Sequence, residues 1–265
     1  MLVPGIGMLL ALWVGGCATH GNKDSGNQDV RRSMTARFAS VPVKVDGVLD
    51  EAVWQQAIAY SFVKYPFRAG GREEKGEAPV EGGEARLAWD NEFLYVAVTF
   101  KDSDLVAEGK EDQLYHFKMG DTVEVFLKPA DQTWYWELYA TPKGNKSSFF
   151  IPGRGRQGLD STARYECGLI VRAKHEGTLN HWEDKDAGWT AELAIPVKDL
   201  TARGEVFRPD SGWFILVSRY NYSRYLLKKE ISTAMPLIDF GPSLHSYEGW
   251  AELRLEKQDR ISEKQ

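Results

Sequence analysis

Apolar side chains recur at every second position along several stretches of this chain, and this period limits what the chain can fold into. The stretches are residues 93–100, 122–127, 189–195, 215–220 and 251–255. Because successive residues of a β-strand face opposite sides of a sheet, a period of two predicts strands. Gly, Pro and Asp residues between the stretches predict tight turns and antiparallel pairing. We therefore predict an all-β fold: an antiparallel two-sheet β-sandwich of jelly-roll or immunoglobulin-like type, with one or two short helices at 50–59 and 196–201.

The size and charge of the chain narrow its possible partners. Its 265 residues are 43% hydrophobic, which is enough for the core of one large β domain. The formal net charge is -5 and the pI is about 5.7, whereas a surface that binds nucleic acid is normally basic. We therefore expect no nucleic-acid partner. The nine Trp residues fit either a Trp-rich core or exposed rings that stack on a ligand.

The N-terminal segment has the pattern of an export signal. Residues 6–14 are mainly apolar, and Gly15, Gly16 and Cys17 follow them. This run is too short to span a membrane, and small residues before a cysteine resemble the bacterial lipobox. We expect residues 1–17 to be a lipoprotein signal peptide and Cys17 to carry the lipid that anchors the protein to a membrane. An ordinary secretory peptide, cleaved or uncleaved, is the alternative.

The remaining chain divides into a tether, one domain and a tail. Residues 18–37 are polar and predict a flexible tether, 38–256 predict the β-sandwich, and 257–265 predict a charged tail. After Cys17 only Cys167 remains, so no intrachain disulfide is expected in the mature protein. Ala18 after the cysteine resembles lipoproteins of the outer membrane. We expect the bacterial cell envelope as the location, on either the periplasmic or the cell-surface face of the outer membrane.

Two neighbouring strand-like runs in the middle of the chain place acidic residues among large aromatic ones. The runs are residues 120–127 and 134–144. Such a combination suits a sugar, because the C–H face of the ring stacks on an aromatic side chain while its hydroxyls donate to a carboxylate. Period two turns Glu124 away from the core and puts the polar residues of the second run on one face. The candidate contacts are Glu124, Glu137, Tyr139, Thr141 and Trp134, with a solvated strand face as the alternative.

Six runs of the sequence, in order, resemble the carbohydrate-binding module family 9-like domains, which have a DOMON-like β-sandwich. They are residues 45–54 (VDGVLDEAVW), 88–98 (AWDNEFLYVAV), 121–127 (DTVEVFL), 135–144 (YWELYATPKG), 177–196 (GTLN to GWTAELAIP) and 245–250 (HSYEGW). The resemblance implies the sandwich fold and an oligo- or polysaccharide ligand. It also implies that Trp54, Trp89 and Trp189 belong to the core.

The same resemblance implies which residues contact the glycan. The position of Glu124 contacts sugar hydroxyls in the family, and the positions of Glu137, Tyr139 and Thr141 also reach the ligand. Well-studied members clamp the sugar between two Trp, and no Trp of this chain matches either position. Tyr115 or Phe117 would substitute for one Trp, and the other position falls at Leu244 and His245.

A catalytic role is not expected. Glu124 and Glu137 on adjacent strands could form the carboxylate pair of a glycosidase, but this requires a defined separation and a raised pKa. The chain has no GxSxG motif, Walker loop or Cys–His nucleophile pair. We therefore expect non-catalytic carbohydrate binding. The alternatives are a haem-binding electron-transfer domain, with His116, Lys118 and Met119 near the haem, and a structural envelope protein without a small ligand.

Two further clusters give weaker expectations. No resident cofactor is expected, although Asp90, Asp184 and Asp186 could supply oxygens to a structural calcium ion, without regular ligand spacing. No metal site is predicted from His116 and His245, which lack any zinc-motif context. The run 219–225 (RYNYSRY) combines two Arg with three Tyr, which would favour an acidic or sulfated sugar unless it forms only an edge strand and a surface loop.

Overall fold

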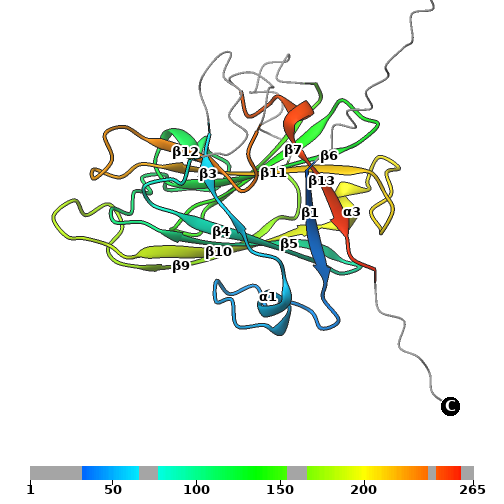
Figure 1. Cartoon of the computed structure of the whole chain (residues 1–265), viewed down its shortest axis with the longest axis horizontal. Coiled ribbons are helices and arrows are strands. Elements are labelled where there is room, and N and C mark those ends of the chain that lie inside the picture. The colour runs from blue at the N-terminus through cyan, green and yellow to red at the C-terminus, as the bar shows by residue number, and fades with distance from the viewer. Residues whose placement is uncertain (1–31, 66–76, 154–165, 238–242, 258–265) are drawn as a thin grey trace, which may run out of the picture. The chain divides into compact units, whose positions relative to one another are not determined.

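The described residues fold into two facing layers of β-strands (Figure 1). The structure, a computed structural model, describes residues 32–65, 77–153, 166–237 and 243–257. One layer has the strand order β8-β7-β6-β11-β13, and the other has the order β4-β5-β10-β9. The prediction of an all-β sandwich with short helices is therefore confirmed. Cys17 and the rest of the signal peptide lie outside the described residues, as do most of the tether and most of the tail.

The strands, and the helices between them, have the following bounds. The strands are β1 Ser33–Phe38, β2 Tyr60–Ser61, β3 Val63–Lys64, β4 Gly83–Trp89, β5 Phe93–Lys101, β6 Thr122–Pro129, β7 Tyr135–Ala140, β8 Lys146–Ile151, β9 Ile170–Glu176, β10 Gly188–Pro196, β11 Trp213–Asn221, β12 Glu230–Thr233 and β13 Ala251–Leu255. The helices are α1 Ala52–Gln56, η1 His116–Lys118, α3 Val197–Leu200 and η2 Tyr247–Gly249. Within the described ranges, every helix is too short or too polar to traverse a lipid bilayer.

Strand β1 connects the two layers and corrects two expectations. It pairs in parallel with β13 on one side and with β4 on the other, whereas the other described pairings are antiparallel. It also begins at Ser33, inside the segment that was expected to be tether. Met34 and Ala36 are fully buried, because alternate residues of this short strand face the interior. Ser33, Thr35 and Arg37, which alternate with these two residues, made the strand resemble a polar linker.

The main core fills the space between the two layers. Val123 and Val125 of β6 and Leu138 of β7 face Val96 and Val98 of β5, and all five are fully buried. This is the burial that period two predicts for strands with one face on a core. Trp89, Trp136 and Trp189 belong to the same cluster, as expected.

A second, smaller cluster packs α1 on the outer face of the β4-β5-β10 layer. Trp54 lies there, 1% exposed, and its indole N–H donates to Oε1 of Glu192 at 2.9 Å. The other oxygen of Glu192 accepts the backbone N–H groups of Asp46 and Gly47. The side chain of Glu192, in β10, therefore holds the turn and helix of residues 45–54 against the sheet. The helix begins after Glu51 rather than after Asp50, and no side chain caps it.

Candidate functional site

Strands β6 and β7 place three of the predicted contacts on one face. The register puts Glu124 opposite Tyr139 and Phe126 opposite Glu137. These residues alternate with Val123, Val125 and their neighbours in the core, so they lie on the outer face of the layer. That face does not meet solvent directly. Glu124 is 2% exposed, Glu137 5% and Tyr139 1%.

Two chain segments and the neighbouring strands cover this outer face and leave a cavity of about 180 Å³. Helix η1 contributes Phe117, with Tyr115 just before it, and the segment that precedes η2 contributes Leu244 and His245. The aromatic residues that line the cavity are Tyr65, Tyr115, Phe117, Phe126, Tyr139, Phe149 and Tyr220. For comparison, an engineered cavity of about 150 Å³ in another protein holds one benzene ring. The cavity therefore has the size of a single six-membered ring.

The aromatic walls brace one another. Tyr115 stacks on Phe149 with ring centroids 5.2 Å apart, and Phe117 contacts Tyr220 at 5.4 Å. Phe126 packs on Trp250 at 5.4 Å. Such contacts fix the orientation of each ring, so the walls are formed before a ligand enters.

Two carboxyl groups form the polar part of the cavity. The hydroxyl of Tyr139 donates to Oε1 of Glu137, and the hydroxyl of Ser218 in β11 donates to Oε2 of Glu124 at 3.1 Å. Burial raises the pKa of Glu137 to about 7, against a hydrogen bond from Tyr139 that lowers it. Burial, and next the charge of Glu137, raise the pKa of Glu124 well above its ordinary value. Because both pKa values are raised, the protonated forms of these two groups are favoured more than those of ordinary carboxyls.

Two lysines lie near the aromatic walls without lining the cavity. The Lys118 ammonium sits 5.0 Å from the ring centre of Tyr115, and the Lys229 ammonium sits 5.1 Å from that of Tyr220. Among the described residues, the ionisable groups that line the cavity are the two glutamates, His245 and four tyrosines. Burial lowers the pKa of His245, whose Nδ1 is 2.6 Å from the hydroxyl of Tyr135. At neutral pH the cavity therefore has no cationic lining side chain among the described residues.

Two predicted contacts lie elsewhere. Thr141 follows the end of β7, and its hydroxyl accepts the backbone N–H of Asn145 at 3.1 Å, so it stabilises a turn. Trp134 is 8% exposed and packs in the main core, with its ring 5.2 Å from Phe150. Period two puts Trp134 on the side of Trp136, which already indicated the core. Thr141 and Trp134 therefore do not line the cavity that Glu124, Glu137 and Tyr139 share.

Several residues that line the cavity were not predicted from the sequence. Ser218 in β11 lies opposite Glu124. Tyr220 is two positions further along the same strand, so it shares the face of Ser218 and faces the cavity. Its place in the run 219–225, on the side opposite Arg219, was the available signal. Tyr65 arrives through the pairing of β3 with β12, and Phe149 through β8. No local pattern identifies these two residues.

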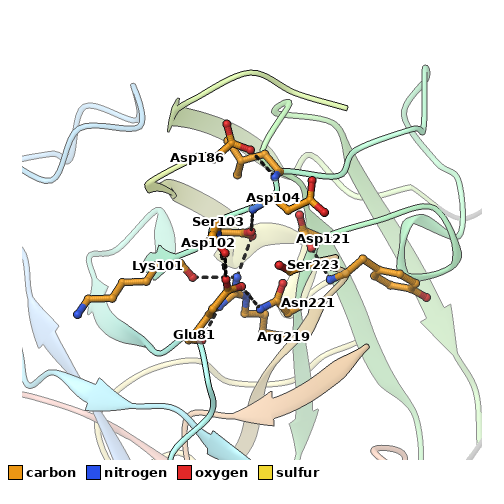
Figure 2. Close-up of polar contacts among 12 residues, drawn as sticks. Glu81, Lys101, Asp102, Ser103, Asp104, Asp121, Asp186, Arg219, Asn221 and Ser223 are labelled. Carbon is orange, nitrogen blue, oxygen red and sulfur yellow. Dashed lines mark hydrogen bonds and ion pairs between the residues drawn. The ribbon is translucent and has the colours of Figure 1, made fainter. Parts of the chain in front are cut away.

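The two arginines of the run 219–225 do not line the cavity, although Tyr220 of the same run does. Arg219 is 1% exposed, and its guanidinium donates to Asp102 at 2.9 Å and to the backbone oxygens of Glu81 and Lys101 (Figure 2). Asn221, on the same face, donates to the Glu81 carboxylate at 2.8 Å. These contacts join loops at one end of the sandwich. Because the charge of Arg219 is already paired with Asp102, this arginine does not support the expectation that the run favours an acidic or sulfated sugar.

The aspartates considered for calcium also have partners within the fold. Asp186 accepts the backbone N–H groups of Leu105 and Thr178, both at 2.7 Å. Asp90 accepts those of Glu92 and Phe93. Within the ranges that the structure describes, no group of three or more His, Cys, Asp or Glu side chains is arranged to hold a metal ion.

The residues considered for haem do not gather around the cavity. His116 is 2% exposed and packs on Gly109, where an added Cβ would lie 2.4 Å from Nδ1. Neither His116, Lys118 nor Met119 lines the cavity that Glu124 and Glu137 share.

A more open hollow of about 450 Å³ lies on the other layer. Asn91, Glu92, Phe93, Gly168, Ile170, Pro196 and Lys198 line it. None of these charged residues is buried. The smaller cavity is therefore the candidate site, because it combines fixed aromatic walls with buried ionisable groups.

Known structures share the fold at low sequence identity. A Bacteroides uniformis protein with a provisional carbohydrate-binding designation matches with a TM-score of 0.60 and 11% identity, over 85% of this chain and 100% of that chain. A carbohydrate binding module family 9 protein from Caldicellulosiruptor kristjanssonii matches in complex with cellotriose (TM-score 0.53, 12% identity, 87% of this chain, 97% of that chain). A structure of a carbohydrate binding module family 9 protein from the same organism in complex with glucose matches with a TM-score of 0.54 and 13% identity, over 87% of this chain and 100% of that chain.

The comparison with family descriptions agrees with the structural one. No curated protein matches the sequence. Residues 45–207, which are more than half of the chain, match the family described as carbohydrate family 9 binding domain-like. The match contains both the 45–54 segment that Glu192 holds and the two strands that carry Glu124 and Glu137. The chain is therefore a member of the carbohydrate family 9 binding domain-like family.

Proposed function

We propose that this protein binds carbohydrate without acting on it, and that one sugar ring of a glycan occupies the cavity above β6 and β7. The observation that carries the proposal is the joining of braced aromatic walls to two buried carboxyl groups in a space of about 180 Å³. The faces of a pyranose are apolar and its edge carries hydroxyls, so it needs both kinds of surface. The family relation and the sugar complexes of the similar structures support the same function.

Each group has a role in this proposal. Tyr115, Phe117 and Tyr220 pack against the C–H face of the ring. Glu124 and Glu137 exchange hydrogen bonds with its hydroxyls, accepting when ionised and donating when protonated. Tyr139 lies opposite Glu124 in the strand register and fixes the orientation of Glu137 through its hydrogen bond to that residue. His245 belongs to the lining and replaces one of the Trp clamps of the well-studied members.

The test is a glycan array followed by calorimetric titration of the best ligand. Tyr139→Phe and Glu124→Ala should each weaken binding by at least about tenfold, because each removes a buried hydrogen-bonding group. Glu183→Ala is the control, since this carboxylate is exposed and outside the cavity. Thermal unfolding of each variant separates loss of the site from loss of the fold. Equal affinity in the wild type and in both folded cavity variants would show that the ligand binds elsewhere.

The absence of catalysis is tested with the same ligand. Incubation of the protein with the bound oligosaccharide should leave its chain length unchanged in chromatography. New reducing ends that disappear in Glu137→Gln would show that the carboxyl pair hydrolyses the glycan, and would overturn the non-catalytic assignment.

We further propose that the protein is a lipoprotein of the bacterial cell envelope, anchored in the outer membrane through Cys17. The support is the apolar run before Gly15 and Gly16, followed by a cysteine. Metabolic labelling with a palmitate analogue should mark the wild type and not Cys17→Ala. Label retained by Cys17→Ala would place the lipid elsewhere.

A further inference from the structure

The two glutamates of the cavity differ from the other buried acids of the described structure in what surrounds them. Asp102 pairs with Arg219 (Figure 2), and Glu192 accepts two backbone N–H groups and an indole. Glu124 and Glu137, by contrast, receive hydrogen bonds from hydroxyls, namely those of Ser218 and Tyr139. A buried carboxylate is normally paired with a cation or with several strong donors. This pair of acids therefore lacks the partner that a buried charge requires.

A proton fills this role in the free protein. Burial raises the pKa of both acids, and the charge of Glu137 raises that of Glu124 further, so a proton on this pair of acids is favoured. A ligand that brings its own positive charge could take the place of that proton. Aromatic walls favour the same kind of ligand, since ring faces attract a cationic group.

On this basis we propose that the cavity prefers an amino sugar, a pyranose with a free ammonium group, over neutral, N-acetylated or acidic sugars. The inference rests on the proposed function, because it specifies the ligand of the same cavity. The ammonium donates to Glu124 and Glu137, and the ring packs between the aromatic walls. A bare metal ion fits this cavity less well, because calcium takes six to eight oxygen ligands and most of the lining is carbon.

The lysines near the cavity do not cancel this preference. Lys118 and Lys229 lie against aromatic faces, and neither belongs to the lining. Lys229 is exposed, so water and salt screen its charge, whereas the charges of the buried carboxylates are screened far less. The uncharged His245 and the tyrosines Tyr65, Tyr115, Tyr139 and Tyr220 are the other ionisable groups that line the cavity.

The exchange of a proton for an ammonium has a measurable consequence. The raised pKa values favour a protonated pair of acids in the free protein, whereas the ammonium stabilises the doubly ionised form. The amino sugar should therefore release a proton from the protein as it binds, while a neutral glycoside should not. Affinity for the amino sugar should fall in acid, where both carboxyls are protonated, and in alkali above the amine pKa of roughly 8. A neutral glycoside should lack the alkaline decrease.

The experiment is isothermal titration near pH 7 in two buffers with different heats of ionisation. The ligands are the methyl glycosides of glucosamine, glucose, N-acetylglucosamine and glucuronic acid, together with the galactosamine glycoside to allow for the position of the ring hydroxyls. At least one amino sugar should bind about tenfold more tightly than its neutral counterpart and release a proton. Glu137→Gln should lose both the preference for the amino sugar and the proton release.

Each outcome decides between the two proposals. If the glucoside binds as tightly as the amino sugars, the amino-sugar preference is wrong and glycan binding stands. If no sugar binds at millimolar concentration, the proposed function fails and the inference fails with it. Glu124→Gln provides a second variant should Glu137→Gln not fold, and Glu183→Gln is the matched surface control. An amino-sugar preference that persists in folded variants of both cavity acids would also overturn the inference.

Discussion

Replacing Glu137 by Gln should make the folded protein more stable at alkaline pH. Burial raises the pKa of this group from 4.5 in the unfolded chain to about 7 in the fold. A carboxyl whose pKa is raised on folding contributes its full stabilisation of the folded state at pH values below its pKa in the unfolded chain. That contribution is lost as the pH rises through the folded value, because the buried group must then ionise. Gln keeps the shape and can accept the bond from Tyr139, but it does not ionise.

The expected magnitude follows from the same values. The difference between 4.5 and about 7, at about 1.36 kcal/mol for each pKa unit, corresponds to about 3 kcal/mol. The wild type should lose this amount relative to Glu137→Gln between about pH 4.5 and pH 8. For a domain of this size, about 3 kcal/mol corresponds to roughly 6–12 °C in melting temperature. The charge of Glu137 also raises the pKa of Glu124, so its removal changes stability in the same direction.

The assay is urea unfolding of the wild type and of Glu137→Gln at a series of pH values across this window. The free energies of unfolding should diverge as the pH rises, with the variant the more stable. Glu183→Gln, at an exposed position, should follow the wild type at every pH. Parallel curves for Glu137→Gln and the wild type would refute the reasoning, since they would mean that Glu137 is hydrated and ionises freely in the fold.

Three further substitutions test other parts of the structure. Asp102→Asn should cost about 3–5 kcal/mol in urea unfolding, because it leaves the Arg219 charge buried without its carboxylate partner. A loss of stability below about 1 kcal/mol would contradict the buried ion pair. Gly47→Ala should cost more than about 1 kcal/mol in thermal unfolding, because Gly47 has φ +84° and a Cβ there would lie 2.9 Å from the backbone of Ala173. An unchanged melting temperature would count against this turn. Trp182→Ala should change stability by less than about 0.5 kcal/mol and remove the fluorescence of an exposed indole, since Trp182 is 70% exposed. A melting temperature lowered by several degrees would show that Trp182 packs against the rest of the fold.

Local periodicity was enough to predict the layers and one side of the candidate site. The alternation within 122–127 identified the core face of β6 and placed Glu124 on the other face. The same rule applied to Trp134 would have assigned it to the core with Trp136. Thr141 does not line the cavity with Glu137 and Tyr139, because β7 ends at Ala140 and a turn begins there, so the alternation does not continue.

Pairing between distant segments accounts for what local patterns did not predict. Period two puts Arg219 on the face opposite Tyr220, but its partner Asp102 lies 117 positions away, and no local pattern links the two. The burial of Glu124 and Glu137 also has a distant origin, since η1 and the segment before η2 cover a face that would otherwise meet solvent. The sequence indicated the acids, but their low exposure and raised pKa values depend on that cover.

The position of β1 between the layers has a consequence for how the chain acquires its structure. Met34 aligns with Leu253, so the first described strand is completed by the last one. Such pairing of sequence-distant strands is slow to form, because a long loop must close before its contacts stabilise the product. The two layers can therefore join through β1 and β13 only after the residues up to Leu255 have been made. A stop before β13 or a cut at Phe38 would leave strand edges open to aggregation.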